Sequence, residues 1–164
     1  MAYIYPGPGT AGDVNLTLIN AAESPSATTT LTVAGLQDMT INASNDVFTW
    51  EQLDSGSKFQ IATTATNSVA MNLVVDQTTF FGTVADASQA ADDTAAELGI
   101  FGLSKQKSSV SFSIFLGNPN GTSSGGKTIS GTGYITGLAP AVSAGEPVWV
   151  TPITITVVGD YSVA

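Results

Sequence analysis

The residues that most resemble a chemical motif lie in a polar loop late in the chain. Gly121–Thr128 reads G-T-S-S-G-G-K-T and matches the phosphate-binding pattern G-x-x-x-x-G-K-T at every fixed position. Such a loop binds phosphate when a strand precedes it and a helix follows, because the helix N-terminus and backbone amides then converge on the anion. The following segment, Ile129–Ile135, is strand-like and too rich in glycine for a helix. We therefore expect a hairpin loop and no nucleotide site.

The same loop carries a second catalytic pattern. Gly121–Gly125 matches G-x-S-x-G, the nucleophile elbow of many hydrolases. The elbow serine needs a histidine to take its proton, and the chain contains none. Cysteine is absent too, which removes thiol catalysis, disulfides and Cys/His metal sites. We predict no catalytic residues and no cofactor.

Carboxylates are the remaining candidates for chemistry. Asp92, Asp93 and Glu97 lie close together in sequence and could hold Ca²⁺ or act as acid and base. More often such a helix face is simply solvated, and the chain has no D-x-D-x-D-G calcium loop. Asp13 and Glu146 are isolated in the sequence. No metal site is predicted.

Charge and composition narrow the possible partners. The chain has 13 acidic residues and four lysines among 164 residues, for a formal net charge of −9. It lacks the clustered cations that grip nucleic-acid phosphates, so tight binding of DNA or RNA is not expected. Charged residues make up 10% of the chain, against ~25% in typical domains. Such a surface suits repeated contact with copies of the same chain, although a plain Ser/Thr-rich β domain has the same bias. No apolar run approaches the ~18 residues of a membrane span, and no signal-peptide pattern is present.

Alternating apolar and polar residues predict a mainly β domain. The clearest strands lie in the last third of the chain, at Ser109–Leu116, Lys127–Gly137 and Val148–Asp160, with shorter runs at 14–19, 29–33, 39–41, 59–63 and 69–75. One helix is predicted at about 86–98. Asp86 is its expected N-cap, Gln89 has the capping-box spacing, and Gly99 is its expected C′ residue.

Two further segments are candidates for contact with a partner. Residues 1–13 are rich in Gly and Pro and predict an extended arm that bears Tyr3 and Tyr5; such an arm either docks on a neighbour or frays. Residues 42–58 are predicted to form a long inter-strand loop that bears Phe48 and Trp50, and large aromatics in a loop favour a partner surface. Alternatively, 47–50 is one more strand with a half-buried face.

Several short segments, in order along nearly the whole chain, resemble tail tube (major tail) proteins of long-tailed, non-contractile bacteriophages. The resemblance is most specific near the end and looser upstream, and it is carried by Ile129–Leu138, Ala144–Pro147, Ile153–Gly159, Gln37–Ile41 and Asn67–Leu73.

This resemblance implies an antiparallel β-sandwich or partly closed β-barrel with one flanking helix, as a single domain over 1–164. It implies hexameric rings that stack into a virion tail tube, assembled in the host cytoplasm, with an acidic lumen that passes genomic DNA without specific binding. The expected partners are further copies, the tape measure, the terminator and the tail tip, with no membrane. The arm and the long loop would bridge rings, which makes Tyr3, Tyr5, Phe48 and Trp50 the expected inter-subunit contacts.

Other functions stay open at this point. A related ring, such as a tail terminator or a capsid decoration protein, would share the same features. A carbohydrate- or receptor-binding β-sandwich module would use Phe48, Trp50 and Tyr134 as stacking platforms. An enzyme is the weakest reading because the chain has no His, Cys or Arg. Coverage of Trp50 by a neighbouring copy would favour the tube, and an open groove around it would favour the binding module.

Overall fold

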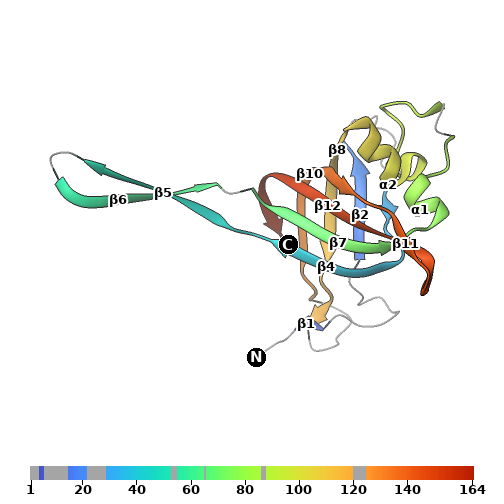
Figure 1. Cartoon of the computed structure of the whole chain (residues 1–164), viewed down its shortest axis with the longest axis horizontal. Coiled ribbons are helices and arrows are strands. Elements are labelled where there is room, and N and C mark those ends of the chain that lie inside the picture. Colours follow the sequence, from blue (N-terminus) through green and yellow to red (C-terminus); the bar gives the residue numbers. More distant parts are fainter. Residues whose placement is uncertain are drawn as a thin grey trace.

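The computed structural model describes residues 4–5, 15–21, 29–52, 55–64, 66–85, 88–119 and 125–164. Most of these residues belong to one antiparallel sheet that curves into a half-barrel, with two short helices at one end (Figure 1). This confirms the predicted mainly β fold. Within the described residues, no helix is long and apolar enough to cross a membrane.

The main sheet has eight strands in the order β3-β2-β8-β10-β12-β7-β4, and β11 pairs with β12 outside this path. All of their pairings are antiparallel. The strands are β2 (Asn15–Asn20), β3 (Leu31–Thr32), β4 (Leu36–Asn42), β7 (Ser68–Val74), β8 (Ser109–Phe115), β10 (Thr128–Leu138), β11 (Ala141–Ser143) and β12 (Glu146–Val163). The long strands β10 and β12 lie at its centre, and they match the strands predicted in the last third.

Strict alternation along these strands builds the core on one face of the sheet. In β8, Val110, Phe112 and Ile114 are buried, while the serines between them point the other way. β7 and β12 repeat the pattern, and the helices add apolar residues to the same core. Since successive strand side chains alternate between faces, the period-2 sequence pattern alone places these residues inside.

The opposite face of the sheet is rich in hydroxyl and amide side chains. Thr136 and Thr156 lie side by side on it, with their Oγ1 atoms 2.8 Å apart. The Asn72 Nδ2 donates to both carboxylate oxygens of Asp38, at 3.0 and 2.9 Å. We call this surface the hydroxyl face.

Two small sheets complete the fold. β1 (Ile4–Tyr5) pairs with β9 (Asn118–Pro119). β5 (Asn45–Gln52) and β6 (Ser55–Thr64) form a hairpin that projects from one end of the body (Figure 1). The segment 42–58 is therefore largely strand and not an irregular loop. The alternative that 47–50 is a strand is confirmed, but of these four residues only Trp50 is half-buried. Residues 45–52 form a strand because β6, which follows directly after the turn, pairs with them.

The predicted helix exists, but its bounds were wrong. The structure has α1 (Gln77–Phe81) and α2 (Ala95–Gln106), whereas residues 88–94 form turns. Asp86 lies outside the described residues. The Thr94 and Glu97 side chains form a complete capping box, with Glu97 Oε2 accepting from Thr94 N at 2.9 Å. Asp93 Oδ2 accepts from the backbone N of Ala90 and holds the preceding turn. The true cap therefore lies eight residues after the predicted one.

Gly99 was predicted to end the helix, and this is also wrong. Its φ of 65° is the left-handed conformation expected of a C′ glycine, yet α2 resumes after this kink and runs to Gln106. Residues beyond the kink, Ile100 and Leu103, are buried in the core. Their burial favours continuing the helix, and Lys107 is the left-handed C-cap instead.

The phosphate-like loop is a hairpin connection, as the sequence predicts. β8 and β10 pair antiparallel on either side of it, and strand β10 follows Lys127 where a phosphate loop requires a helix. Residues 121–124, which include the serine of the elbow pattern, lie outside the described residues.

Candidate interaction surfaces

The β5–β6 hairpin, which we call the arm hairpin, presents one apolar face. The register pairs Trp50 with Phe59 and Phe48 with Ile61. Directly opposed residues and residues two apart share a face, so these four side chains form one surface, the apolar arm face. The other side of the hairpin is mostly polar and carries the exposed Lys58–Glu51 ion pair at 3.4 Å.

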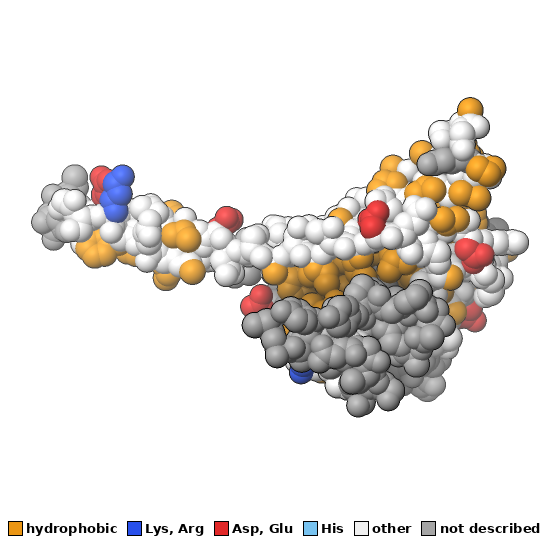
Figure 2. Space-filling view, turned by 90° about the horizontal axis from the view of Figure 1, so that it is seen from below, with side chains coloured by type: hydrophobic (Ala, Val, Ile, Leu, Met, Phe, Trp, Pro, Cys, Tyr) orange, Lys and Arg blue, Asp and Glu red, His pale blue; other side chains and the backbone are white. Residues whose placement is uncertain are grey.

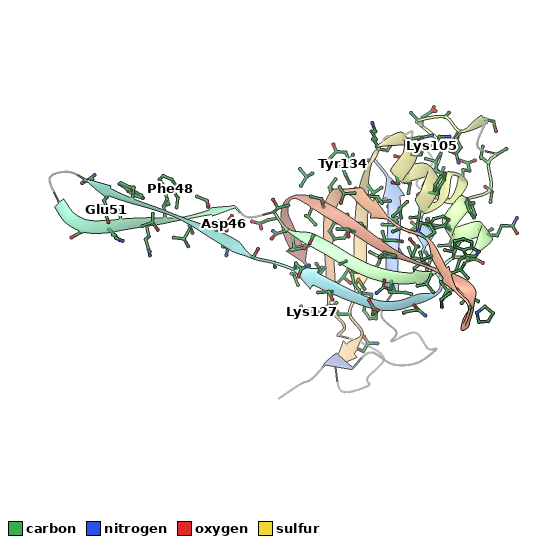
Figure 3. All side chains as sticks on the ribbon, viewed as in Figure 1. Asp46, Phe48, Glu51, Lys105, Lys127 and Tyr134 are labelled. Carbon is green, nitrogen blue, oxygen red and sulfur yellow. The ribbon has the colours of Figure 1, made fainter. Side chains whose placement is uncertain are left out.

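Aromatic stacking organises the apolar arm face but leaves it uncovered. The rings of Phe48 and Trp50 have centroids 6.0 Å apart, and those of Trp50 and Phe59 are 5.7 Å apart, with small interplanar angles. Trp50 is half-buried between its neighbours, while Phe48 is 59% and Ile61 56% exposed. Figure 3 shows Phe48 on the arm, away from the body. An exposed apolar face of this kind is typical of a surface that contacts another molecule.

The base of the arm hairpin is tied firmly to the sheet. Tyr161 Oη donates to the carbonyl oxygens of Asn42 and Ser68, at 2.8 and 3.0 Å, and these residues flank the hairpin in the chain. The buried Asn67 accepts from Ser44 N through its Oδ1 at 3.1 Å. Burial raises the pKa of the Tyr161 phenol. These bonds fix where the arm leaves the body.

A second apolar surface lies at the opposite end of the molecule, around the helices (Figure 1). It is a groove of about 290 Å³ lined entirely by apolar residues, and we call it the end groove: Val75, Phe80, Phe81, Phe101, Pro140 and Trp149. Phe80 is buried beneath it, whereas Phe81, Phe101 and Trp149 are between 41% and 52% exposed. In the space-filling view, hydrophobic side chains gather at this end of the body as well as along the arm (Figure 2).

Helix caps hold the aromatic residues of the end groove in place. Asp76 caps α1, with Oδ2 accepting from the backbone N of Thr78 and Thr79 at 3.1 and 2.9 Å. This short helix carries Phe80 and Phe81, whose rings meet edge to face at 4.9 Å. Hydrogen bonds from the Thr79 backbone and the Thr78 side chain lower the pKa of Asp76, and those from Thr94 lower the pKa of Glu97.

Two glycines let α1 and α2 meet backbone to backbone beneath the end groove. Gly82 and Gly99 have φ of 73° and 65°, a region that favours glycine. A Cβ on Gly99 would lie 2.3 Å from Gly82 N and 2.7 Å from Phe80 O. Thr83 N and Val84 N both donate to the carbonyl of Glu97 at 3.0 and 3.1 Å. The groove is thus a preformed part of the body.

The hydroxyl face is the third surface. A shallow hollow of about 450 Å³ lies on it, lined by residues that include Thr17, Ser111, Thr132 and Asp160. Tyr134 lies on β10, 44% exposed and paired with Thr156 of β12. Among main-sheet strand residues with described side chains, Asp38 and Asp160 are the carboxylates. The surface thus combines hydroxyl side chains with a few apolar ones, such as the exposed Val158, and carries little charge.

The predicted contact residues fall into different places. Phe48 and Trp50 come together on the apolar arm face. Tyr5 lies in β1, with its side chain outside the described residues, and Tyr3 is outside them altogether. Tyr134 projects from the body and Phe48 from the arm (Figure 3), so the three stacking residues of the carbohydrate-binding alternative do not form one platform.

Sequence reasoning missed much of both apolar surfaces. Phe59 and Ile61 were assigned to a strand without a role, although Phe48-Thr49-Trp50 and Phe59-Gln60-Ile61 flank a polar turn, which is a hairpin signal. The groove residues Phe81, Phe101 and Trp149 had no signal, because they come from separate segments. The acidic cluster was assigned a solvated role: Asp93 and Glu97 accept local backbone hydrogen bonds. The described residues contain no group of three or more Asp or Glu that could hold a metal.

No protein-family model matches the chain, and no curated protein matches it. Solved structures do. A chain in the tail of an empty gene transfer agent particle, with C6 symmetry, is 14% identical, with a TM-score of 0.56 over 90% of this chain and 95% of that one. A chain in the six-fold symmetrised baseplate of the anti-feeding prophage is 8% identical, with a TM-score of 0.52 over 98% and 97%. The chain therefore has the fold of components of these tail-like particles over almost its whole length.

Proposed function

We propose that this protein is a structural subunit of a phage-like tail tube, without catalytic activity, that assembles into hexameric rings and then stacks of rings. The observation that carries the proposal is the apolar arm face, an aromatic surface held out from the body with nothing of the described chain covering it. The fold likeness to a chain of a six-fold symmetric tail supports it.

The proposed subunit comprises residues 1–164 as one domain, with the arm hairpin and the N-terminal segment bridging rings. Phe48 and Trp50 would then be covered by a neighbouring copy, and Tyr3 and Tyr5 would add contacts from residues 1–13. Terminator, tape measure and tail-tip proteins would be its further partners in the particle. The non-contractile character is part of this proposal, because a fold alone does not separate bare tubes from tubes enclosed by a sheath.

The hydroxyl face is our candidate for the wall of the conduit. It is broad and polar, and it offers no cation to hold a phosphate among the described main-sheet strand residues. Asp38 and Asp160 would supply its negative charge, multiplied by the copies in each ring. DNA would then pass without specific binding, because repulsion from carboxylates and weak contacts with hydroxyls give it no site to occupy.

Negative-stain electron microscopy of the purified protein, with solution mass measured in parallel, tests the proposal. Rings or tubes with a central channel are the expected result, across a range of concentration and salt. A strictly monomeric or trimeric protein that stays so when seeded with tail-tip components would overturn it. Binding to a glycan array by that species would instead support the carbohydrate-binding module.

A further inference from the structure

The end groove is an apolar hollow that no side chain of the described residues fills. Its six lining residues are apolar and three of them are exposed aromatics. Its volume of about 290 Å³ compares with the roughly 150 Å³ of a cavity that binds a benzene ring. It is therefore large enough to accept an aromatic side chain.

We infer that the end groove binds the apolar arm face of a second copy of this chain. This inference rests on the proposed function and names the acceptor for the arm. The arm hairpin and the end groove lie at opposite ends of the molecule (Figure 1), so one contact would cover both exposed apolar surfaces. Such a head-to-tail contact leaves a free arm and a free groove at the two ends, so it can repeat along an axis.

Charge supports the same pairing. The Lys58–Glu51 ion pair lies on the other side of the hairpin, so docking the apolar arm face leaves it in water. Asp46 lies at the base of the arm (Figure 3), on the side that strand alternation gives to Phe48 and Trp50. Lys105 lines an adjoining hollow together with Phe81 and Phe101. Opposite charges at the edge of the contact fix its orientation without being buried in its centre.

The forms of the two surfaces also suit this contact. Phe48, Trp50 and Phe59 form a row of stacked rings on a two-stranded ribbon, with Trp50 in the middle. The groove is a preformed aromatic slot held by helix caps and by the Gly82–Gly99 contact. Because the groove is already formed, it loses little conformational freedom when the hairpin binds, and this favours binding.

Cysteine cross-linking tests the contact directly, because the chain has no native cysteine. Ile61→Cys places a thiol on the apolar arm face, and Pro140→Cys places one at the rim of the end groove. The double variant, oxidised mildly, should give a ladder of covalent multimers on a denaturing gel, at least five-fold above either single variant. Gln60→Cys with Pro140→Cys is the matched control on the opposite side of the arm.

The outcomes separate the contact from the tube. Strong dimers from Ile61→Cys alone would replace it with an arm-to-arm contact, and an equal ladder from the Gln60→Cys control would overturn it. Rings or tubes by microscopy without a 61–140 ladder would reject the groove but keep the proposed function. A ladder without rings or tubes would support the groove contact and count against the tube. Absence of both would reject both.

A charge exchange gives a second readout. Lys105→Glu should weaken association several-fold at low salt, and adding Asp46→Lys should restore most of it. Lys107→Glu is the control, because Lys107 lines neither the end groove nor the adjoining hollow. Equal weakening by both lysine variants, with no rescue, would show a general effect of net charge and overturn the proposed orientation.

Discussion

The two exposed apolar surfaces of this chain are built in opposite ways. The arm hairpin is a two-stranded ribbon stabilised by its own cross-strand pairs and tied down at its base. The end groove is carved into the body, with the buried Phe80 beneath it and capped helices around it. A projecting ribbon depends on a partner for burial, whereas a groove over a core exists without one. The difference fits our inference that the arm hairpin inserts and the end groove receives it.

The largest expected effect is a difference in stability between a glycine variant beneath the end groove and one in the arm hairpin. Gly99→Ala should lower the free energy of unfolding by at least about 2 kcal/mol, because alanine is strained at this φ and its Cβ would meet backbone atoms of α1. Gly56→Ala in the arm hairpin is the matched control, since nothing lies within 4 Å of its added Cβ. Urea denaturation of both variants checks this. Equal losses would mean that the groove is no more rigidly built than the arm.

The next largest effect is expected on assembly and not on stability, for a substitution in the arm hairpin. Trp50→Ser should abolish or weaken assembly more than ten-fold while leaving the unfolding midpoint of the body nearly unchanged, because Trp50 lies outside the core cluster. Thr49→Ser, on the other side of the hairpin, is the control. Sedimentation measures the change in assembly, and thermal unfolding measures the change in the midpoint. A large loss of stability with Trp50→Ser would show that the arm supports the fold itself.

Tyr161 links the arm hairpin to the body, and its removal should have an intermediate effect. Tyr161→Phe removes the phenol O–H, whose single proton is shared between the carbonyls of Asn42 and Ser68, and should cost about 1 kcal/mol. Hydrogen exchange at residues 42–46 should rise with it, while exchange in β8 stays slow. Unchanged exchange at the arm base would contradict a clamping role for this tyrosine.

Acid should loosen the end groove before the arm hairpin. The pKa values of Asp76 and Glu97 are lowered in the fold by their helix-cap hydrogen bonds. A lowered folded-state pKa contributes stability above the unfolded-state value, about 4, and this contribution is lost as pH falls through the folded-state pKa. Aromatic proton shifts of Phe81 and Phe101 should therefore change on acidification below about pH 4. Asp76→Asn should weaken that change, and an identical titration in this variant would argue against the cap.

The smallest effect is expected in the arm ion pair. Glu51→Gln should change stability by less than about 0.5 kcal/mol, because Glu51 and Lys58 are both mostly exposed and their attraction is screened by water. Assembly should be unaffected, since the pair faces away from the apolar arm face. A clear loss of assembly would place the contact on the other side of the hairpin.

Much of the fold was predictable because strand patterning is local. The alternation in 109–116, 127–137 and 148–160 identified β8, β10 and most of β12. The helix was misplaced because Ala-rich residues near 87–91 have helical spacing, while the decisive signals were the Thr94–Glu97 cap and the burial of Ile100 and Leu103. Gly99 illustrates the limit: its left-handed backbone was predictable, but its role at a helix crossing was not.

The sequence by itself determined the alternating strands, the absence of His and Cys chemistry, the low charge and the aromatic residues near 48–50. These follow from residue type and short-range spacing, which act within one element. Only the tertiary structure decided that Phe48, Trp50, Phe59 and Ile61 share one projecting face, and that residues 75, 80, 81, 101, 140 and 149 converge at the other end. Strand register and helix packing bring those groups together over long sequence separations, where no local pattern records the contact.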